Sequence, residues 1–355
     1  MAGVEPVFDG SVAVRPSQLS AWMDAHGLEA GELCDFERLT GGTQNLIVRF
    51  RRGERSFVLR RPPLHPRPDG DKTILREARV LGALAKSGVP HPGLIAACGD
   101  TSVIGSAFYL MEPVEGFNPS GRPLKASHAD NPEWRRRMGF AMVDALLALG
   151  EVIPENVGLE GFGKPQTFLE RQVPRWRAHL EACPASERWF GPSGLIGLDD
   201  LGQQLENSRP DTFLPGVLHG DFHLANVMFR NDSPELAAVI DWELATLGDP
   251  LLDLGWLVAT WPDPTGHGAG TIHVQPWDGF PTADELVQHY ANGSHRDLSH
   301  IDWYIALANY KLAIMLEASH ARACAGRASL EIGDKHHASA LQLVQNGLSR
   351  LASRR

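Results

Sequence analysis

Two aspartates and one asparagine in the second half of the chain have the types and spacing that phosphoryl transfer requires. Asp221 is followed five residues later by Asn226, and Asp241 comes fifteen residues after that asparagine. In phosphoryl transfer, one carboxylate orients the attacking hydroxyl group, while an amide oxygen and a second carboxylate hold Mg²⁺ on the phosphates of a nucleotide. We therefore predict that Asp221 is the catalytic residue and that Asn226 and Asp241 bind Mg²⁺.

The residues around Asp221 favour a catalytic loop over an ordinary turn. Asp, His and Asn are common in turns for conformational reasons, so one such triplet would mean little. Here four polar residues fall within eight positions between two strand-like stretches: His219, Asp221, His223 and Asn226. We expect His219 to be a packed structural residue, whereas the sequence leaves the role of His223 open. Glu243 either supports the metal site or faces the substrate.

The motif HGDFHLAN, followed by IDWE and GDPLLDLGW, resembles the aminoglycoside phosphotransferase and choline kinase superfamily, whose members are related to the protein kinases. The N-terminal segments LTGGTQNLIVRF and FYLMEPVEGFNP resemble the phosphotransferase-like domains that are fused to certain acyl-CoA dehydrogenases. This resemblance covers nearly the whole chain. It implies an α+β, bilobal, protein-kinase-like fold, in which the small lobe has an antiparallel sheet and one main helix and the larger lobe is mostly helical.

The order of the expected elements fits such an arrangement. We predict a nucleotide-binding lobe with an N-terminal helix over residues 1–112 and a catalytic and substrate-binding lobe over residues 113–355. In the first lobe, the periodicity predicts helices over 15–31 and 72–86, a hairpin of 47–50 with 56–59, and strands near 94–98 and 108–111. In the second lobe it predicts helices over 132–150, 167–183, 198–208, 284–292, 302–322 and 333–353.

A glycine-containing turn in the first lobe is a candidate for binding the phosphates of a nucleotide. Gly41, Gly42, Thr43 and Asn45 lie just before a strand, where small residues let backbone NH groups approach phosphate oxygens. The segment is neither a Walker A motif nor the GxGxxG motif of protein kinases. A Gly-Gly turn by itself is usually only a hairpin turn, so its assignment depends on the catalytic loop downstream.

Four further positions are assigned to the nucleotide through the resemblance. Arg60 ends a strand at the place where the superfamily has a phosphate-binding lysine, and Glu77 in the following helix would position that cation. Both residues also fit an ordinary helical or surface role, and Arg61 is the alternative cation. Glu112 and Val114 lie in the connection between lobes, where the resemblance implies two backbone hydrogen bonds to adenine.

The cofactors that these residues imply are Mg²⁺ and ATP, with GTP possible, and the partner is a small molecule with a hydroxyl group. The fused relatives imply a hydroxyacyl or hydroxyacyl-CoA acceptor. The superfamily name implies a cationic sugar antibiotic, and a non-catalytic nucleotide-binding module is the third alternative. Lys311 and Arg322 are eleven residues apart on one expected helix and share a face, which favours an anionic acceptor.

Composition restricts the other classes of function. The formal net charge of −10 argues against nucleic-acid binding as the main activity. Four cysteines without CxxC or Cys/His spacing indicate a reducing compartment and no structural zinc. The N-terminus does not resemble a signal peptide, and no apolar run approaches the about 20 residues that cross a bilayer. We expect a cytoplasmic protein with no membrane partner, and the sequence does not indicate its oligomeric state.

Overall fold

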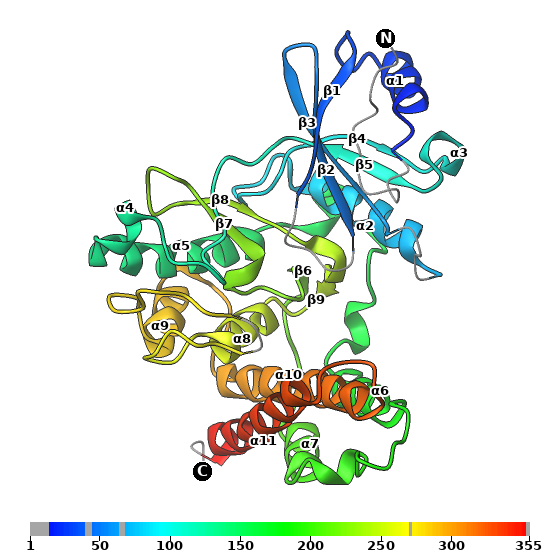
Figure 1. Ribbon diagram of the computed structural model, residues 1–355. Helices are drawn as coiled ribbons and strands as arrows, with labels where there is room; N and C mark the ends of the chain where they lie inside the picture. The colour runs from blue at the N-terminus through cyan, green and yellow to red at the C-terminus, as the bar shows by residue number, and fades with distance from the viewer. Residues whose placement is uncertain (1–13, 40–44, 64–67, 270–271, 353–355) are drawn as a thin grey trace. The chain divides into compact units, whose positions relative to one another are not determined.

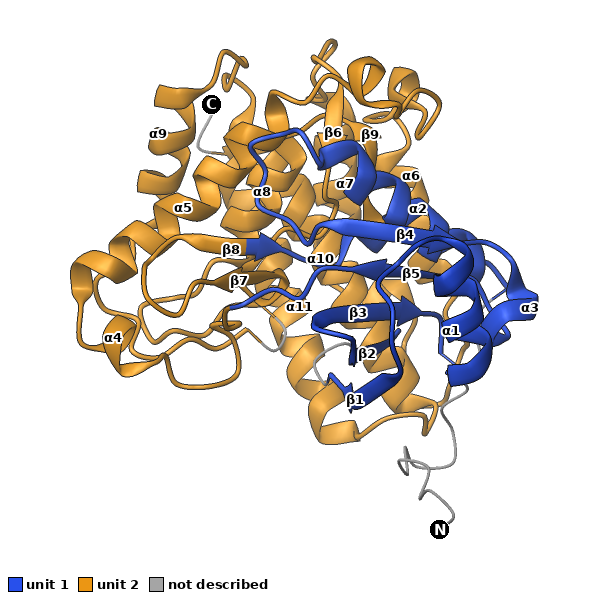
Figure 2. Cartoon of the chain, turned by 90° about the horizontal axis from the view of Figure 1, so that it is seen from above, with its two compact units in different colours: residues 1–115, 238–243 blue, residues 116–237, 244–355 orange. Residues whose placement is uncertain are grey.

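In the computed structural model (Figure 1), the chain forms two compact units, which Figure 2 shows in different colours. The residues that it describes are 14–39, 45–63, 68–269 and 272–352. Unit 1 contains residues 1–115 and 238–243, and unit 2 contains residues 116–237 and 244–355. The boundary after residue 115 lies three residues beyond the predicted boundary after residue 112. The short segment 238–243 also belongs to unit 1. Within that segment, the Val239 NH donates to the carbonyl of Pro90 at 2.8 Å.

Unit 1 is built on a five-stranded antiparallel sheet with the order β1-β2-β3-β5-β4. The strands are β1 (Leu33–Arg38), β2 (Leu46–Arg52), β3 (Arg55–Arg61), β4 (Leu94–Cys98) and β5 (Phe108–Met111). β2 and β3 form the predicted hairpin, in which Val48 lies opposite Leu59 and Phe50 opposite Phe57. These four apolar side chains are buried in the core of the unit.

The described residues of unit 1 also form the helices α1 (Pro16–Ala25), α2 (Gly70–Leu84) and α3 (Thr101–Ile104). α1 is shorter than predicted, since it starts with Pro16 in its first turn and ends before Gly27, whose φ is +64°. α2 is the predicted main helix, and it contacts β3, β4 and β5. Its buried side consists of apolar residues and one carboxylate, Glu77.

Unit 2 is mostly helical. Its helices are α4 (Ala126–Ala129), α5 (Pro132–Gly150), α6 (Gln172–Glu181), α7 (Leu198–Asn207), α8 (Leu251–Thr260), α9 (Ala283–Gly293), α10 (Ile301–Cys324) and α11 (Leu330–Ala352). Four short strands lie in this part of the described sequence: β6 (Gly216–Leu218), β7 (Val227–Phe229), β8 (Leu236–Val239), where the chain passes into unit 1, and β9 (Thr246–Gly248). β6 pairs with β9. Among the described residues, the 3-10 turns are η1 (Pro154–Val157), η2 (Pro165–Thr167), η3 (Pro192–Gly194), η4 (Leu224–Asn226) and η5 (Trp242–Leu244), which begins in unit 1 and ends in unit 2.

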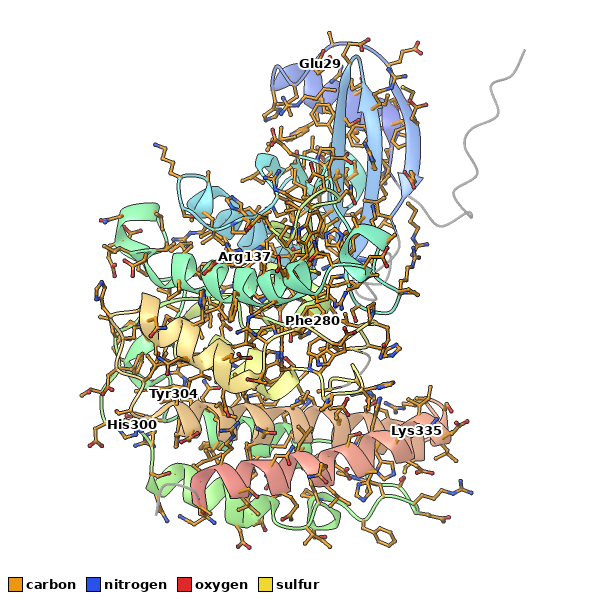
Figure 3. All side chains as sticks on the ribbon, turned by 90° about the vertical axis from the view of Figure 1, so that its left-hand side faces the viewer. Glu29, Arg137, Phe280, His300, Tyr304 and Lys335 are labelled. Atoms are coloured by element: carbon orange, nitrogen blue, oxygen red, sulfur yellow. The ribbon has the colours of Figure 1, made fainter. Side chains whose placement is uncertain are left out.

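Helix α10 lies at the centre of unit 2 and contacts α6, α7, α8 and α11. Figure 3 labels Tyr304 on α10 and Lys335 on α11, which run side by side. The Tyr304 hydroxyl donates to Asp249, and Asp249 also accepts the NH of Leu251, the first residue of α8, at 3.1 Å. Asp249 therefore links the start of α8 to α10. No helix in the described part of the chain has the length and apolar character to cross a membrane.

Candidate active site

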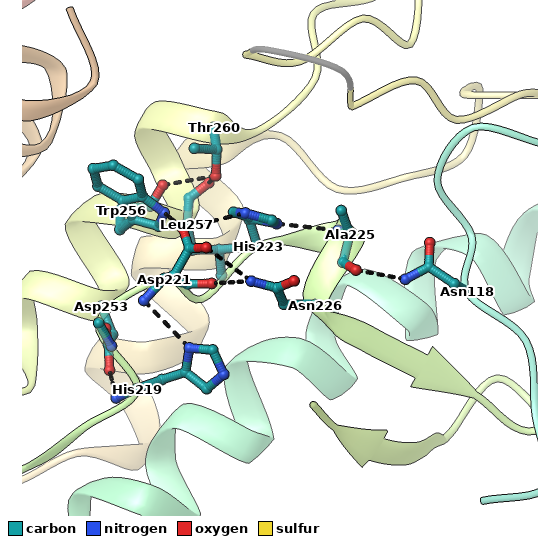
Figure 4. A network of polar contacts seen from close by, with 11 residues as sticks. Asn118, His219, Asp221, His223, Ala225, Asn226, Asp253, Trp256, Leu257 and Thr260 are labelled. Atoms are coloured by element: carbon teal, nitrogen blue, oxygen red, sulfur yellow. Dashed lines mark hydrogen bonds and ion pairs between the residues drawn. The ribbon is translucent and has the colours of Figure 1, made fainter. Parts of the chain in front are cut away.

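The candidate catalytic loop runs from the end of β6 to the start of β7, and helix α8 holds its first residues (Figure 4). The carboxylate of Asp253 on α8 accepts the backbone NH groups of His219 at 2.6 Å and Gly220 at 2.9 Å. Asp253 is fully buried, and these two bonds satisfy a carboxylate that would otherwise be costly to bury. The loop is therefore fixed to the first turn of α8 through its backbone.

Gly220 has a backbone conformation and surroundings that only glycine fits. Its φ is +87°, and a Cβ atom at this position would lie 2.5 Å from the carbonyl oxygen of Leu244. L-residues rarely adopt this φ, and the neighbouring atom belongs to the backbone and cannot rotate away. The glycine thus lets the loop pass close to the backbone of Leu244 directly before Asp221.

We expect Gly220→Ala to lower the free energy of unfolding by about 1–3 kcal/mol or more, because it adds both a strained φ and a backbone clash. Thermal unfolding followed by circular dichroism measures this change. Gly158→Ala is the matched control, since Gly158 has a φ of +73° and nothing within 4 Å of the added Cβ. If both variants lose the same stability, the close approach to Leu244 contributes nothing.

Three donors hold the Asp221 carboxylate. Its Oδ1 accepts the Trp256 indole NH at 3.0 Å and lies 3.2 Å from His223 Nε2, while its Oδ2 accepts the Asn226 amide NH at 3.0 Å. His223 Nδ1 accepts the Ala225 NH at 3.2 Å, so the ring hydrogen sits on Nε2 and is donated to Asp221. The role that the sequence left open for His223 is thus a place in this network.

These contacts decide the ionisation of Asp221. Burial acts to raise the pKa of its carboxyl, but the hydrogen bond from His223, together with the effects of His219 and Asn226, lowers the pKa to about 2. The group is therefore an anion at every physiological pH and a weak base. Oδ1 already has two partners and Oδ2 has one, so among the described contacts Oδ2 is the oxygen that can accept a further hydrogen bond.

Asn226 is oriented by its amide nitrogen. Besides Asp221 Oδ2, this nitrogen donates to the Asp221 carbonyl at 2.9 Å, which leaves the amide oxygen as the atom able to bind a cation. Asn118 donates to the carbonyls on both sides of Asn226, those of Ala225 at 2.7 Å and Val227 at 3.0 Å. The position of Asn226 is therefore fixed by its own side-chain amide and by the two hydrogen bonds from Asn118 to the neighbouring carbonyl groups.

A second polar cluster, in unit 1, contains Arg60 and two carboxylates. Arg60 Nε lies 2.8 Å from Glu77 Oε2, and its Nη2 lies 2.5 Å from Asp241 Oδ1. The Tyr109 hydroxyl donates to Glu77 Oε2 at 3.0 Å. Burial raises the pKa of Glu77 against the charge of Arg60. The predicted Arg60–Glu77 ion pair is formed, and its role in binding phosphates stays a prediction.

Arg61, the alternative cation, points to a different part of unit 1, because successive residues of a strand face opposite sides. It donates to the Ile104 carbonyl at 3.0 Å. Asp241 follows β8 with a φ of +67°, a conformation that aspartate tolerates better than most residues but that still costs energy. Strained residues of this kind are concentrated at functional sites, which fits the predicted metal-binding role of Asp241.

Of the remaining nucleotide-binding candidates, some lie within the described residues and others do not. Gly41, Gly42 and Thr43 lie outside the described residues. Asn45 and Glu243 both belong to unit 1, and the Asn45 side-chain amide donates to Glu243 Oε2 at 3.5 Å.

The Glu112 NH is already bonded to the Gly93 carbonyl at 2.8 Å, and its side chain pairs with Arg55 at 3.2 Å. In any backbone hydrogen bond between Glu112 and adenine, the Glu112 carbonyl would therefore be the acceptor. Val114 follows β5 and is partly exposed.

Lys311 is buried next to the Asp221 network. Its Nζ lies 4.9 Å from the ring centre of Trp256, the tryptophan that donates to Asp221, and 5.4 Å from that of Trp176. Burial lowers the pKa of Lys311 to about 8, opposed by the charges of Asp253 and Asp221. The sequence predicted that Lys311 and Arg322 line one side of the helix, but Arg322 is exposed near the end of α10, so only Lys311 lies close to the site.

Comparison with known proteins identifies the family. Residues 35–298, most of the chain, match the phosphotransferase enzyme family. The chain belongs to this family. Over 319 residues the phosphotransferase is also 30% identical to acyl-CoA dehydrogenase family member 10 of Mus musculus, with 88% of this chain and 28% of the mouse protein covered. It thus spans little more than a quarter of the length of that relative.

Solved structures confirm the predicted fold class. A Ralstonia eutropha protein, provisionally named an aminoglycoside phosphotransferase, has a TM-score of 0.77 and 28% identity, with 95% of this chain and 98% of that chain covered. A thermostable aminoglycoside phosphotransferase mutant in complex with AMP-PNP and hygromycin B has a TM-score of 0.60 and 14% identity, with 95% and 99% covered. The phosphotransferase therefore has a kinase-like α+β fold.

The sequence did not single out Asn118 or Trp256 as parts of the site. Both lie within segments that carry the family resemblance, Asn118 in FYLMEPVEGFNP and Trp256 in GDPLLDLGW. Their only signal was a polar group within otherwise apolar or turn-like surroundings. That signal does not say which loop the side chain reaches.

Proposed function

We propose that this phosphotransferase moves the γ-phosphoryl group of ATP, or of GTP, to a hydroxyl group of a small anionic molecule such as a hydroxyacyl or hydroxyacyl-CoA compound. The observation that carries this proposal is the Asp221 carboxylate, which is ionised, fixed by three donors and able to accept one more hydrogen bond at Oδ2. A hydroxyl group donating to Oδ2 would have its oxygen oriented for attack on phosphorus.

The low pKa of Asp221 agrees with positioning more than with early proton removal. Phosphoryl transfer passes through a loose transition state, in which the attacking oxygen forms little bond and keeps its proton until late. A weakly basic carboxylate is sufficient for that task, provided that it is held still. His223 and Trp256 hold Oδ1, which leaves Oδ2 to the acceptor.

We propose that Asn226 and Asp241 bind Mg²⁺. Both offer hard oxygen donors, which this ion prefers, and the amide orientation of Asn226 presents oxygen and not nitrogen. When bound, the ion would neutralise charge on the phosphates. Arg60, oriented by Glu77, would add positive charge for the phosphates, and a guanidinium binds two oxygens of such a group. The AMP-PNP complex of the fold relative supports nucleotide as the donor.

Lys311 supports an anionic acceptor. Its buried ammonium group lies over two indole rings, one of them the tryptophan that touches Asp221, and its positive charge would attract an anionic acceptor. A polycationic aminoglycoside would be repelled by the same group. The mouse relative is named for acyl-CoA dehydrogenation, which agrees with an acyl acceptor. The second candidate, an antibiotic kinase, is supported by the name of the Ralstonia eutropha protein.

Release of ADP with a panel of acceptors tests the proposal. We expect Mg²⁺-dependent ADP release above the water background with hydroxyacyl-CoA compounds or hydroxy acids, and none with kanamycin-type antibiotics. Turnover of aminoglycosides alone, with antibiotic resistance on expression in a susceptible host, would favour the second candidate. Nucleotide binding without transfer to any acceptor would favour a non-catalytic module.

Lys311→Met is expected to raise the KM for an anionic acceptor by about tenfold or more, the effect of losing a charged contact of about 1.5–3 kcal/mol. Since the pKa of Lys311 is about 8, its ammonium is charged below that pH and lost above it. The wild-type kcat/KM should therefore fall as the pH rises through about 8, and the variant should lack this decrease. Steady-state kinetics from pH 6 to about 9.5 measure both effects.

Lys125→Met is the matched control for Lys311→Met, because Lys125 also lies over an aromatic ring, that of Phe117 at 5.5 Å, but is exposed. It should leave the KM and the pH profile unchanged. A wild-type profile that stays flat through pH 8, with an unchanged KM in Lys311→Met, would remove Lys311 from the acceptor site.

A further inference from the structure

Helices α10 and α11 bring together three side chains whose donor atoms suit a metal ion, away from the Asp221 network. Glu317 and His320 lie on α10 and His337 on α11, and one donor atom from each lies within 4.8 Å of the others. We propose that Glu317, His320 and His337 bind a divalent transition-metal ion, with Zn²⁺ as the preferred ion.

The helix geometry accounts for how the three residues meet. Glu317 and His320 are three residues apart and therefore share one face of α10. α11 packs closely along α10 at Gly333, which has no side chain. A Cβ atom at this position would lie only 2.5 Å from the Cβ of Ala323. His337 is one turn beyond Gly333, so the close approach of the helices brings its ring to Glu317.

The distances fit the size of a zinc site. Glu317 Oε2 lies 2.7 Å from His337 Nδ1, and Glu317 Oε1 lies 3.4 Å from His320 Nδ1. A tetrahedral zinc with bonds of about 2.0–2.2 Å holds neighbouring ligand atoms about 3.4 Å apart. Small side-chain rotations would therefore bring all three donors to bonding distance. Two imidazole nitrogens with one carboxylate suit Zn²⁺ better than Mg²⁺ or Ca²⁺, which prefer oxygen ligands.

The surroundings of the cluster support binding of a cation. The Glu317 carboxylate is only 1% exposed, and the Trp189 indole NH donates to its Oε1 at 2.8 Å, which orients Oε2 toward His337. On the other side of His320, Nε2 lies 3.2 Å from Cys324 Sγ and 3.6 Å from Asp334 Oδ1. Metal-binding histidines commonly donate their second ring NH to such groups.

Access and charge are also suitable. The His337 side chain is 30% exposed, so an ion can reach the cluster from solvent. A buried carboxylate is costly unless a cation compensates its charge, and a divalent ion would do so. The cysteine spacing predicted no structural zinc, but that spacing gives no information about a site made of one glutamate and two histidines. This ligand set depends on the packing of two helices, with His337 seventeen residues after His320.

Zinc titration of the metal-free 355-residue chain tests the proposal. The protein is treated with a chelator, desalted, and titrated with Zn²⁺ by calorimetry in millimolar Mg²⁺, which occupies oxygen-only sites. We expect one Zn²⁺ per chain at saturation and a higher Tm with Zn²⁺, because the ion links α10 to α11. Replacement by Co²⁺ should give the intense visible bands of a tetrahedral site, with no strong thiolate band if Cys324 stays outside the ligand set.

His337→Ala and Glu317→Gln should each weaken Zn²⁺ binding at least about tenfold. His337→Ala is the safer variant for folding, since His337 is partly exposed. His289→Ala is the matched control, because it removes a comparable histidine–carboxylate pair, with Asp144 at 2.7 Å, elsewhere in unit 2. Equal Zn²⁺ binding by wild type and His337→Ala, or no stoichiometric binding by wild type, would overturn the proposal and leave the cluster as a hydrogen-bonded network.

Discussion

Asp221→Asn is expected to lower kcat by about 10²–10⁴-fold and to leave nucleotide affinity almost unchanged. The substitution keeps the shape of the side chain but removes the negative charge that would hold the acceptor hydroxyl. It also puts an amide where Trp256 and His223 now donate to a carboxylate oxygen. ADP release measures kcat on the identified acceptor, and calorimetry with a non-hydrolysable nucleotide measures the affinity.

Asp144→Asn provides the matched control for this experiment. Asp144 also pairs with a histidine, His289, at 2.7 Å, but lies in a different part of unit 2. It should retain wild-type kcat, because neither residue belongs to the Asp221 network. Full activity of Asp221→Asn would show that the assigned role is wrong.

The low pKa of Asp221 has a further consequence for pH dependence. Because the folded-state pKa, about 2, lies below the ordinary value of 3.8, ionisation of Asp221 contributes stability above the ordinary pKa. That contribution is lost only as the pH falls through the range between the two values. Asp221 should therefore add no acidic limb to the activity profile between pH 5 and about 8.

The contact between Asp221 and Asn226 was predictable from sequence because the two residues are close in the chain. Asp221 and Asn226 are five residues apart, and the structure joins them directly through the Asn226 amide. The hairpin of β2 with β3 and the long helix α5 were predictable for the same reason, since short-range periodicity determines which residues are buried. A single turn, strand pair or helix contains the information for each of these features.

Contacts between distant segments were not predictable in this way. Trp256 reaches Asp221 from 35 residues away, and Asn118 reaches the loop from 107 residues away at Ala225. The burial of Lys311 follows from the packing of α10 against α6 and α8, whereas its own helix suggested only a shared face with Arg322. Local propensity does not determine which helices pack together, so it could not distinguish the buried lysine from the exposed arginine.

Asp241→Ala is expected to weaken Mg²⁺-dependent nucleotide binding by about 10²-fold, because it removes one of the two proposed oxygen ligands and a charged partner of Arg60. Nucleotide titrations with and without Mg²⁺ measure this effect. In the wild type, Mg²⁺ should increase the affinity, and in the variant this increase should disappear. Weak binding through Arg60 should remain, since Glu77 still orients the guanidinium.

Two further variants separate the loss of charge from the change in backbone strain. Asparagine tolerates a positive φ better than alanine, so Asp241→Asn should keep the backbone at +67° and still lose the Mg²⁺ dependence. Asp35→Ala is the control, because Asp35 also has a positive φ, 55°, and pairs with an arginine, Arg51, at 2.8 Å in unit 1. If Asp241→Asn retains the Mg²⁺ dependence of the wild type, Asp241 is not a metal ligand. Glu243, two residues later and also a carboxylate, would then be the next residue to test.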